Sequence, residues 1–514
     1  MNPMKMSLMA AFLLLALEGC RVPLQSYRLN PFHPAIEVSP VDGDPAETNA
    51  TEQPVKDCVN ADTPICLAFI ELDDMGEPYN KVELDTALSL IRRANDIANA
   101  DPIVITFVHG WKNNAGLGND NVRGFKAALR EVYQHFATMN QPHHVIGIYI
   151  GWRGDLIRGY LPVARQFSYF NREGTAIRIP GATLSSALTQ IATRTHQNHR
   201  ALAIFIGHSF GGLLLERALT EATASQIAEA SIYSDDAKGA DLSSSNVQEE
   251  KLAASQAANS RADLVIFINP AGAATEAKQM LDFMTNNRFR YQPLGNPNEE
   301  ISKDPDLDRP LFVSLTSTAD MATKVALPIG HGLPYLGFKA NGSFLDLDQT
   351  PSKKYELSCF DPHNSQHETW SLTTKEQGAV SQGSYYLSSA PHMQILQSHV
   401  MLKAVGANQM RVSSTGQTIQ IQDPNAIANC DRDLFNKQNL NIVSTFKLAD
   451  TKACFAIQER PNRCNGTPYW LMEIDPDVVP DHSTIFTRRF ISFVIETFFA
   501  PNGRALQRLN PQLK

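Results

Sequence analysis

Short, continuous apolar runs recur along the chain, and each is rich in β-branched or aromatic residues. Runs of this length and composition predict strands that are buried on both faces. They occupy residues 65–72, 103–108, 145–150, 201–206, 264–268 and 311–315. The first two thirds of the sequence therefore predict a series of buried strands.

Between these runs the apolar residues follow a helical spacing. In one segment they step by three or four positions, which predicts an amphipathic helix. Its apolar residues are Val122, Phe125, Leu129, Val132 and Phe136. Further helical stretches are expected near 182–194 and from residue 213 onward. Repeated β-α-β units imply a mostly parallel sheet covered by helices on both faces, so the predicted fold class is a doubly wound α/β domain.

Two segments interrupt this alternation. Residues 219–260 are rich in Ala, Ser, Gln and Glu and predict a polar helical insertion. Residues 330–465 carry weaker, mixed signals, with a helix expected around His392–Val405, and are interpreted as an insertion or cap.

The alternation then resumes near the C-terminus. A strand is expected at 469–474, and a helix is expected at 490–499. We therefore expect residues 466–514 to complete the core formed by residues 64–329.

The N-terminus has the pattern of an export signal. Ten uncharged, apolar residues at 8–17 match a signal-peptide h-region and are too short to span a bilayer. They run into Gly19-Cys20, which resembles the bacterial lipobox, although Glu18 stands where that motif has a small residue. We expect residues 1–19 to be a signal peptide and Cys20 to be lipidated. An uncleaved apolar arm and an ordinary secretory signal are the alternatives.

The segment that follows is rich in proline and polar residues. Residues 20–63 lack a lasting apolar periodicity, so they are expected to form a tether, or else an arm that lies along the domain surface. Together these features predict an exported bacterial lipoprotein, anchored to the membrane on the periplasmic or cell-surface side.

Composition narrows the classes of protein. A hydrophobic fraction of 43% excludes a disordered chain, and no apolar stretch reaches the length of about 20 residues that a membrane span needs. The 45 basic and 53 acidic residues give a net charge of −8, which argues against a nucleic-acid partner. The 514 residues are best explained as one decorated domain.

The strongest chemical motif is Gly207-His208-Ser209-Phe210-Gly211. It matches G-x-S-x-G and lies directly between a predicted strand and a predicted helix. Such a junction forces the serine into a strained turn that exposes its oxygen at the end of the sheet. The N-terminus of the following helix also presents backbone N–H groups toward developing negative charge.

With this motif in place, the core resembles the α/β-hydrolase superfamily, in particular bacterial serine esterases and lipase-like enzymes. The resemblance covers about residues 65–330 and 466–500. Its His-Gly loop matches His109-Gly110-Trp111. The resemblance implies an oxyanion hole made of backbone N–H groups of Phe210 and of Gly110 or Trp111. We expect His109 itself to organise the loop.

The resemblance also implies an acid and then a histidine after the serine. Asp320 lies just beyond the strand at 311–315, where the superfamily commonly places its acid; a helix N-cap is the other interpretation. His482 lies in a loop between the last strand and the last helix and is assigned as the general base, with His331 in reserve. His363 and His367 have too little helical context to predict a metal site.

The expected function is therefore that of a serine hydrolase that cleaves carboxylic esters through an acyl-enzyme. Ser209, Asp320 and His482 would form its triad, no metal or cofactor is expected, and the partners would be a small-molecule or lipid ester and the membrane. Thioesterase or amidase activity on the same triad stays open, as does a non-catalytic, surface-anchored binding protein on this scaffold.

Six cysteines remain besides Cys20. In an oxidising compartment they can pair fully, and short loops favour Cys58 with Cys66 and Cys454 with Cys464, which leaves Cys359 with Cys430.

Overall fold

The structure is a computed structural model of the whole chain. It describes residues 26–27, 39–40, 65–97, 101–116, 118–138, 143–155, 172–220, 222–223, 262–271, 311–317, 319–320, 469–474, 476 and 478–495, together with short strands between residues 354 and 458. The structural statements below concern these residues.

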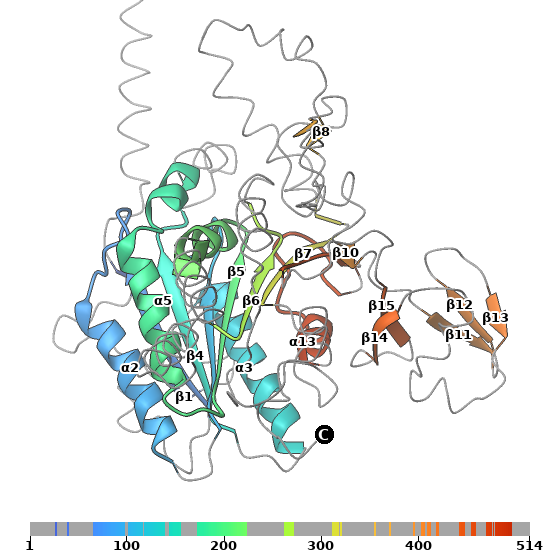
Figure 1. The fold of residues 1–514 in the computed structure, drawn as a ribbon, viewed down its shortest axis with the longest axis horizontal. Coiled ribbons are helices and arrows are strands. Elements are labelled where there is room, and N and C mark those ends of the chain that lie inside the picture. Colours follow the sequence, from blue (N-terminus) through green and yellow to red (C-terminus); the bar gives the residue numbers. More distant parts are fainter. Residues whose placement is uncertain are drawn as a thin grey trace, which may run out of the picture.

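A nine-stranded sheet forms the centre of the fold, with the order β1-β2-β4-β3-β5-β6-β7-β16-β10 (Figure 1). Its members are β1 (Ser39–Pro40), β2 (Ile65–Leu72), β3 (Ile103–Val108), β4 (Val145–Trp152), β5 (Leu202–His208), β6 (Leu264–Ile268), β7 (Phe312–Ser317), β10 (Gln394–Ile395) and β16 (Tyr469–Ile474). Every neighbouring pair is parallel except β1 with β2. The predicted α/β class is confirmed.

The strands form where they do because both faces of the sheet are covered. Every residue within the strands β2, β3, β4, β5, β6 and β7 is buried, which explains why these segments are predominantly apolar on both sides. Helices α2 (Lys81–Asn95) and α5 (Ala182–Thr195) pack with residues 210–220 on one face. Helices α3 (Asp120–Thr138) and α13 (Arg488–Val494) pack on the other face (Figure 1).

The expected core strands are present within two residues of their predicted ends. Sequence reasoning missed α2, although Asn80 accepts a hydrogen bond from the backbone N–H of Val82 and caps it. Helix α13 begins at Arg488, two residues before the helix predicted at 490–499, and residues 496–499 lie outside the described residues.

The helix expected around His392–Val405 is wrong. Residues Gln394–Ile395 form β10, and Leu402–Gly406 form β11. Strand β10 pairs with β16, and β11 pairs with β15, both of which lie far along the chain, so local spacing could not reveal these two pairings. The other partner of β11 is β12 (Gln409–Val412), which follows it directly as a hairpin.

The 330–465 segment contributes more than an insertion. Through β10 it adds a strand to the main sheet, next to β16. It also holds a five-stranded antiparallel sheet of β13 (Thr418–Gln420), β12 (Gln409–Val412), β11, β15 (Cys454–Gln458) and β14 (Ile442–Lys447). A two-stranded sheet pairs β8 (Lys354–Tyr355) with β9 (Trp370–Ser371). Residues 224–260, most of the predicted helical insertion, lie outside the described residues.

Two points of the 20–63 segment contact the domain. The Ser26 hydroxyl donates to the Glu71 carboxylate over 2.6 Å, and the Tyr27 backbone N–H donates to the same carboxylate over 2.8 Å. Ser39–Pro40 pairs with β2 as β1. At these residues the chain lies along the domain surface. Within the described part of the chain, no helix has the length and apolarity to cross a bilayer.

Candidate active site

The candidate site lies at the end of the sheet formed by the carboxyl termini of the parallel strands. Ser209 follows β5, His109 follows β3, and Asp320 follows β7 within three residues. His482 lies in the loop between β16 and α13. Parallel strands present their carboxyl ends at the same edge, so residues distant in sequence meet there.

Ser209 occupies a left-handed turn between β5 and the helix at 210–220. Its φ is 55°, in a region that an L-residue rarely adopts, and neighbours without side chains make this possible. A Cβ on Gly207 would lie 2.6 Å from the Gly211 carbonyl oxygen, and a Cβ on Gly211 would meet the Val108 carbonyl oxygen. The motif glycines are therefore required by the close packing of the backbone.

The structure brings the three predicted triad residues together. The imidazole Nε2 of His482 lies 2.9 Å from Ser209 Oγ, and its Nδ1 lies 2.9 Å from Asp320 Oδ2. Asp320 is 0% exposed and Ser209 is 5% exposed, whereas the His482 side chain keeps 23% of its surface in solvent. A buried carboxylate, an imidazole and a hydroxyl are thus in hydrogen-bonding sequence, with the imidazole edge open to solvent.

The loop around His482 is held by its own short-range bonds. The Asp481 carboxylate accepts hydrogen bonds from the backbone N–H groups of Ser483 and Thr484 and from the Thr484 hydroxyl. Burial acts to raise the pKa of Asp481, but these bonds outweigh it and hold the pKa below its usual value. The Thr487 hydroxyl donates to the Val478 carbonyl over 2.8 Å and closes the loop at its other end.

The loop after β3 lies directly against the serine. A Cβ on Gly110 would lie 2.7 Å from Ser209 Cβ and 2.8 Å from the His208 carbonyl oxygen. Phe210, the other predicted source of an oxyanion-hole N–H, is buried at the start of the helix at 210–220. The backbone segments assigned to the oxyanion hole therefore border Ser209 from two sides.

His109 joins the ends of β3 and β4. Its Nε2 accepts from the Trp152 backbone N–H over 3.0 Å, so the proton lies on Nδ1, which donates to the Gly110 carbonyl over 2.9 Å. The Trp152 indole N–H donates to the His109 carbonyl over 2.7 Å, and the two rings stack. Complete burial lowers the pKa of His109 to about 4, so the ring is neutral at physiological pH.

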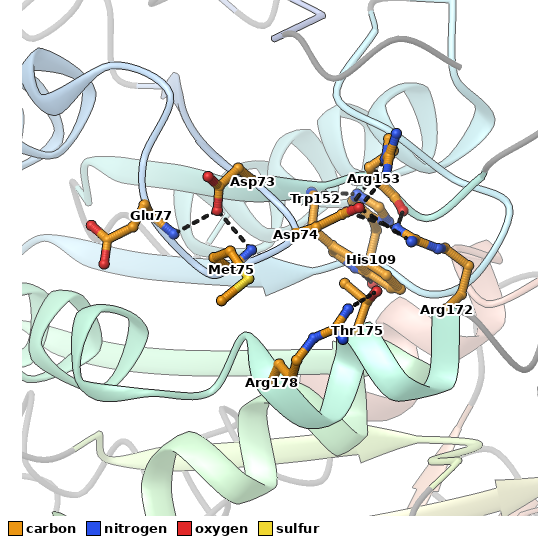
Figure 2. A network of polar contacts seen from close by, with 10 residues as sticks. All are labelled: Asp73, Asp74, Met75, Glu77, His109, Trp152, Arg153, Arg172, Thr175 and Arg178. Carbon is orange, nitrogen blue, oxygen red and sulfur yellow. Dashed lines mark hydrogen bonds and ion pairs between the residues drawn. The ribbon is translucent and has the colours of Figure 1, made fainter. Parts of the chain in front are cut away.

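An ion cluster of Asp74, Arg153 and Arg172 supports the loop that carries Gly110. Figure 2 shows the guanidinium group of each arginine directed at the Asp74 carboxylate. Arg172 is 1% exposed and also donates to the Arg153 carbonyl over 2.8 Å. The next residue, Gly154, accepts from the Lys112 backbone N–H over 2.9 Å, and its Cβ would lie 2.9 Å from the Gly110 carbonyl oxygen. The cluster therefore fixes the loop on which the Gly110 segment rests.

Several of the predicted residues fall outside the described part of the chain. His331, His363 and His367 lie outside the described residues, as do Cys20, Cys58, Cys359, Cys430 and Cys464. Cys66 is buried in β2, and Cys454 begins β15. The disulfide pairing stays a prediction. Across the described ranges, no group of three or more His, Cys, Asp or Glu side chains is arranged to hold a metal ion.

Sequence reasoning missed the polar groups that support the site, namely Asp74, Arg153, Arg172, His208, Asn269 and Ser317. A usable signal existed for two of them, because His208 and Asn269 are polar residues at the carboxyl ends of strands that are otherwise apolar. Their partners lie in remote segments and have no sequence signature.

No protein-family model, no curated protein and no solved structure matches the chain. The interpretation of the site therefore rests on its geometry.

Replacement of Gly110 by Ala tests the close approach to Ser209. The added methyl group would overlap Ser209 Cβ and the His208 carbonyl. We expect the rate of Ser209 labelling by a fluorophosphonate to fall about 100-fold, the scale of a misplacement of roughly 1 Å. Gly118→Ala is the matched control, because a Cβ there meets no atom within 4 Å. Unchanged labelling of Gly110→Ala would show that the contact is not needed.

Asp74→Asn tests the ion cluster. Burial raises the pKa of Asp74, but the hydrogen bonds from Arg172 and Arg153 outweigh it and hold the pKa below its usual value. The variant leaves the Arg172 guanidinium buried without its carboxylate, and we expect it to lower the free energy of unfolding by about 3 kcal/mol at neutral pH.

The same variant should show a characteristic pH dependence. A carboxylate with a depressed pKa stabilises the fold above its unfolded-state pKa of about 3.9, and this contribution is lost as the pH falls through the lower folded-state value. Denaturant unfolding from pH 7 to pH 3 should therefore show the difference between wild type and Asp74→Asn shrinking toward acid. Asp85→Asn, at an exposed position of α2, is the control and should change little. If the difference in unfolding free energy between wild type and Asp74→Asn stayed constant with pH, the lowered pKa of Asp74 would be contradicted.

Proposed function

We propose that the protein is a serine hydrolase of the α/β-hydrolase type that cleaves carboxylic esters through an acyl-enzyme. The observation that carries the proposal is the continuous hydrogen-bond sequence from Ser209 Oγ through His482 to the buried Asp320, at a serine with φ 55°. A strained serine at a strand-to-helix turn, with an imidazole and a carboxylate in line, fits nucleophilic catalysis.

Each group of the triad has a defined task in this mechanism. Ser209 Oγ attacks the ester carbonyl carbon while His482 Nε2 takes its proton. The Asp320 carboxylate accepts from the Nδ1–H of His482, which fixes the tautomer and stabilises the imidazolium. The imidazolium then delivers its proton to the departing alcohol, and water repeats the sequence on the acyl-enzyme, which releases the acid and restores Ser209.

The oxyanion of the tetrahedral intermediate needs donors on the side away from His482. The backbone N–H of Phe210 and one from Gly110 or Trp111 are assigned this role. Phe210 starts a helix whose N-terminus favours negative charge, and Gly110 contacts Ser209. Each such donor contributes about 3 kcal/mol to catalysis in a water-excluded site.

The triad does not define which type of substrate bond is cleaved. A triad of this kind also hydrolyses thioesters or amides, and leaving-group preference is set by pocket contacts that the triad does not define. The rival from another class, a binding protein on a hydrolase scaffold, has no use for an in-line imidazole and carboxylate behind a strained serine.

Membrane anchoring would bring a lipid ester within reach of the proposed site. We propose that Cys20 is lipidated in an exported lipoprotein. Ser26 is held by Glu71 near the carboxyl end of β2, the same edge of the sheet that carries Ser209. The six residues from Cys20 to Ser26 span at most about 20 Å, so this edge would stay close to the bilayer.

Labelling and substitution test the triad. We expect wild type to react with a fluorophosphonate at Ser209 and Ser209→Ala to lose the label entirely. Asp320→Asn should lower kcat about 10⁴-fold through the wrong histidine tautomer. Ser186→Ala, on the exposed surface of α5, is the control. Rates on matched acyl esters, thioesters and amides then rank the bond types. An intact, folded protein that never reacts with the phosphonate favours the binding protein.

Metabolic labelling tests the anchor. With a radioactive fatty acid supplied to a bacterial host that has a lipoprotein export pathway, we expect the label on wild type and its loss in Cys20→Ser, together with release from the membrane fraction. Ser186→Ala, on the exposed surface of α5, is the control for substitution as such. Label that persists in Cys20→Ser would place the lipid elsewhere.

A further inference from the structure

Three neighbouring strands of the sheet end in residues that contact one loop. His208 ends β5, Asn269 directly follows β6, and Ser317 ends β7. Each of the three side chains donates a hydrogen bond to a backbone carbonyl in the loop that carries His482. The loop itself follows β16, which lies beyond β7 in the sheet.

His208 makes the shortest link to the histidine itself. Its Nε2 lies 2.6 Å from the carbonyl oxygen of His482. A carbonyl oxygen can only accept, so Nε2 of His208 carries a proton and donates it to this bond. The side chain is 2% exposed, and burial together with the nearby His482 lowers the pKa of His208 to about 3. The bond therefore persists over the pH range in which hydrolases work.

Asn269 ties the second strand to the same place. Its amide nitrogen lies 3.3 Å from the Asp481 carbonyl oxygen and 3.4 Å from that of His482. Its amide oxygen accepts from the Ser317 backbone N–H over 2.9 Å, which fixes the orientation of the amide. Asn269 has a φ of 44°, a left-handed conformation that Asn tolerates better than most residues.

Ser317 is the third strand-end residue that holds the His482 loop, and it does so at Val479. Its hydroxyl donates to the carbonyl oxygen of Val479 over 2.6 Å, and Val479 is fully buried. The loop is thus held at Val479, Asp481 and His482 by side chains whose own backbones belong to the rigid centre of the sheet.

We propose that His208, Asn269 and Ser317 are positioning residues that set the distance between His482 and Ser209, with His208 as the principal one. This inference rests on the proposed function, since it concerns the same triad. His208 precedes Ser209 in the chain and holds the carbonyl of His482, so one strand end places both the hydroxyl and the imidazole that meet at 2.9 Å. Without that link, Asn269 and Ser317 would still hold the loop at Asp481 and Val479, but the His482 carbonyl would keep only the longer contact of 3.4 Å with Asn269.

A pair of substitutions separates this hydrogen bond from simple packing. His208→Gln keeps an N–H donor at nearly the reach of Nε2, whereas His208→Met fills the same space without a donor. We expect His208→Met to lower kcat and the phosphonate labelling rate about 10- to 100-fold with KM nearly unchanged, and His208→Gln to recover most of both. Asn269→Asp, which keeps the acceptor for the Ser317 N–H and removes the donor, should also slow labelling.

His196→Gln is the matched control. His196 is a buried histidine whose Nε2 lies 2.9 Å from Asp263 Oδ2, at the opposite edge of the sheet. We expect both His196→Gln and the His208 variants to lower the melting temperature. Only His196→Gln should leave kcat per folded molecule unchanged. Equal kcat in wild type, His208→Gln and His208→Met would overturn the proposal, as would an equal loss of kcat in the Gln and Met variants.

A measurement that needs no turnover separates the hydrolase proposal from the proposed positioning role of His208. The proton between His482 Nδ1 and Asp320 should give a downfield proton resonance in wild type and in His208→Gln, and a broadened or absent one in His208→Met. If wild type fails to react with the phosphonate but the resonance follows this pattern, the hydrolase proposal fails and the positioning role stands. An unperturbed resonance in His208→Met refutes the positioning role whatever the activity.

Discussion

The candidate site depends on the close approach of three backbone segments around Ser209. The β5 turn, the start of the helix at 210–220 and the loop after β3 approach so closely that a Cβ at Gly110, Gly207 or Gly211 would overlap neighbouring atoms. This packing holds Ser209 at φ 55°, a conformation that costs on the order of 1–3 kcal/mol and needs surrounding structure to maintain it. The parallel sheet supplies that structure, because β3 and β5 are adjacent and end at the same edge.

Polar groups buried at this end of the sheet are held by partners from other loops, helices and strand ends. Asp320 faces His482, His109 joins the ends of β3 and β4, and Asp74 holds Arg153 and Arg172 behind the Gly110 loop. A buried charge or imidazole without a partner would cost several kcal/mol, so these contacts both stabilise the edge and restrict its geometry. The neutral state of His109 and His208 follows from the same burial.

The segments outside the core also meet this edge or extend the sheet. Ser26 and Tyr27 contact Glu71 near the end of β2, and the insertion returns a short strand, β10, to the side of β16. At these described residues, the N-terminal segment and the 330–465 segment are therefore joined to the sheet that carries the candidate site.

The core strands, the α/β class and the choice of Ser209 as the candidate nucleophile could all be predicted from the sequence, because buried strands and the G-x-S-x-G turn leave local patterns. The choice of Asp320 and His482 also came from the sequence, through their order and the elements around them, but their contact was an expectation. Only the tertiary structure showed that His482, 273 residues after Ser209, lies within hydrogen-bond distance of it. The same holds for the strand β10, expected as part of a helix, and for the supports at Asp74, His208 and Asn269. These depend on which segments become neighbours in the folded chain, and local spacing carries no record of partners that lie tens to hundreds of residues away.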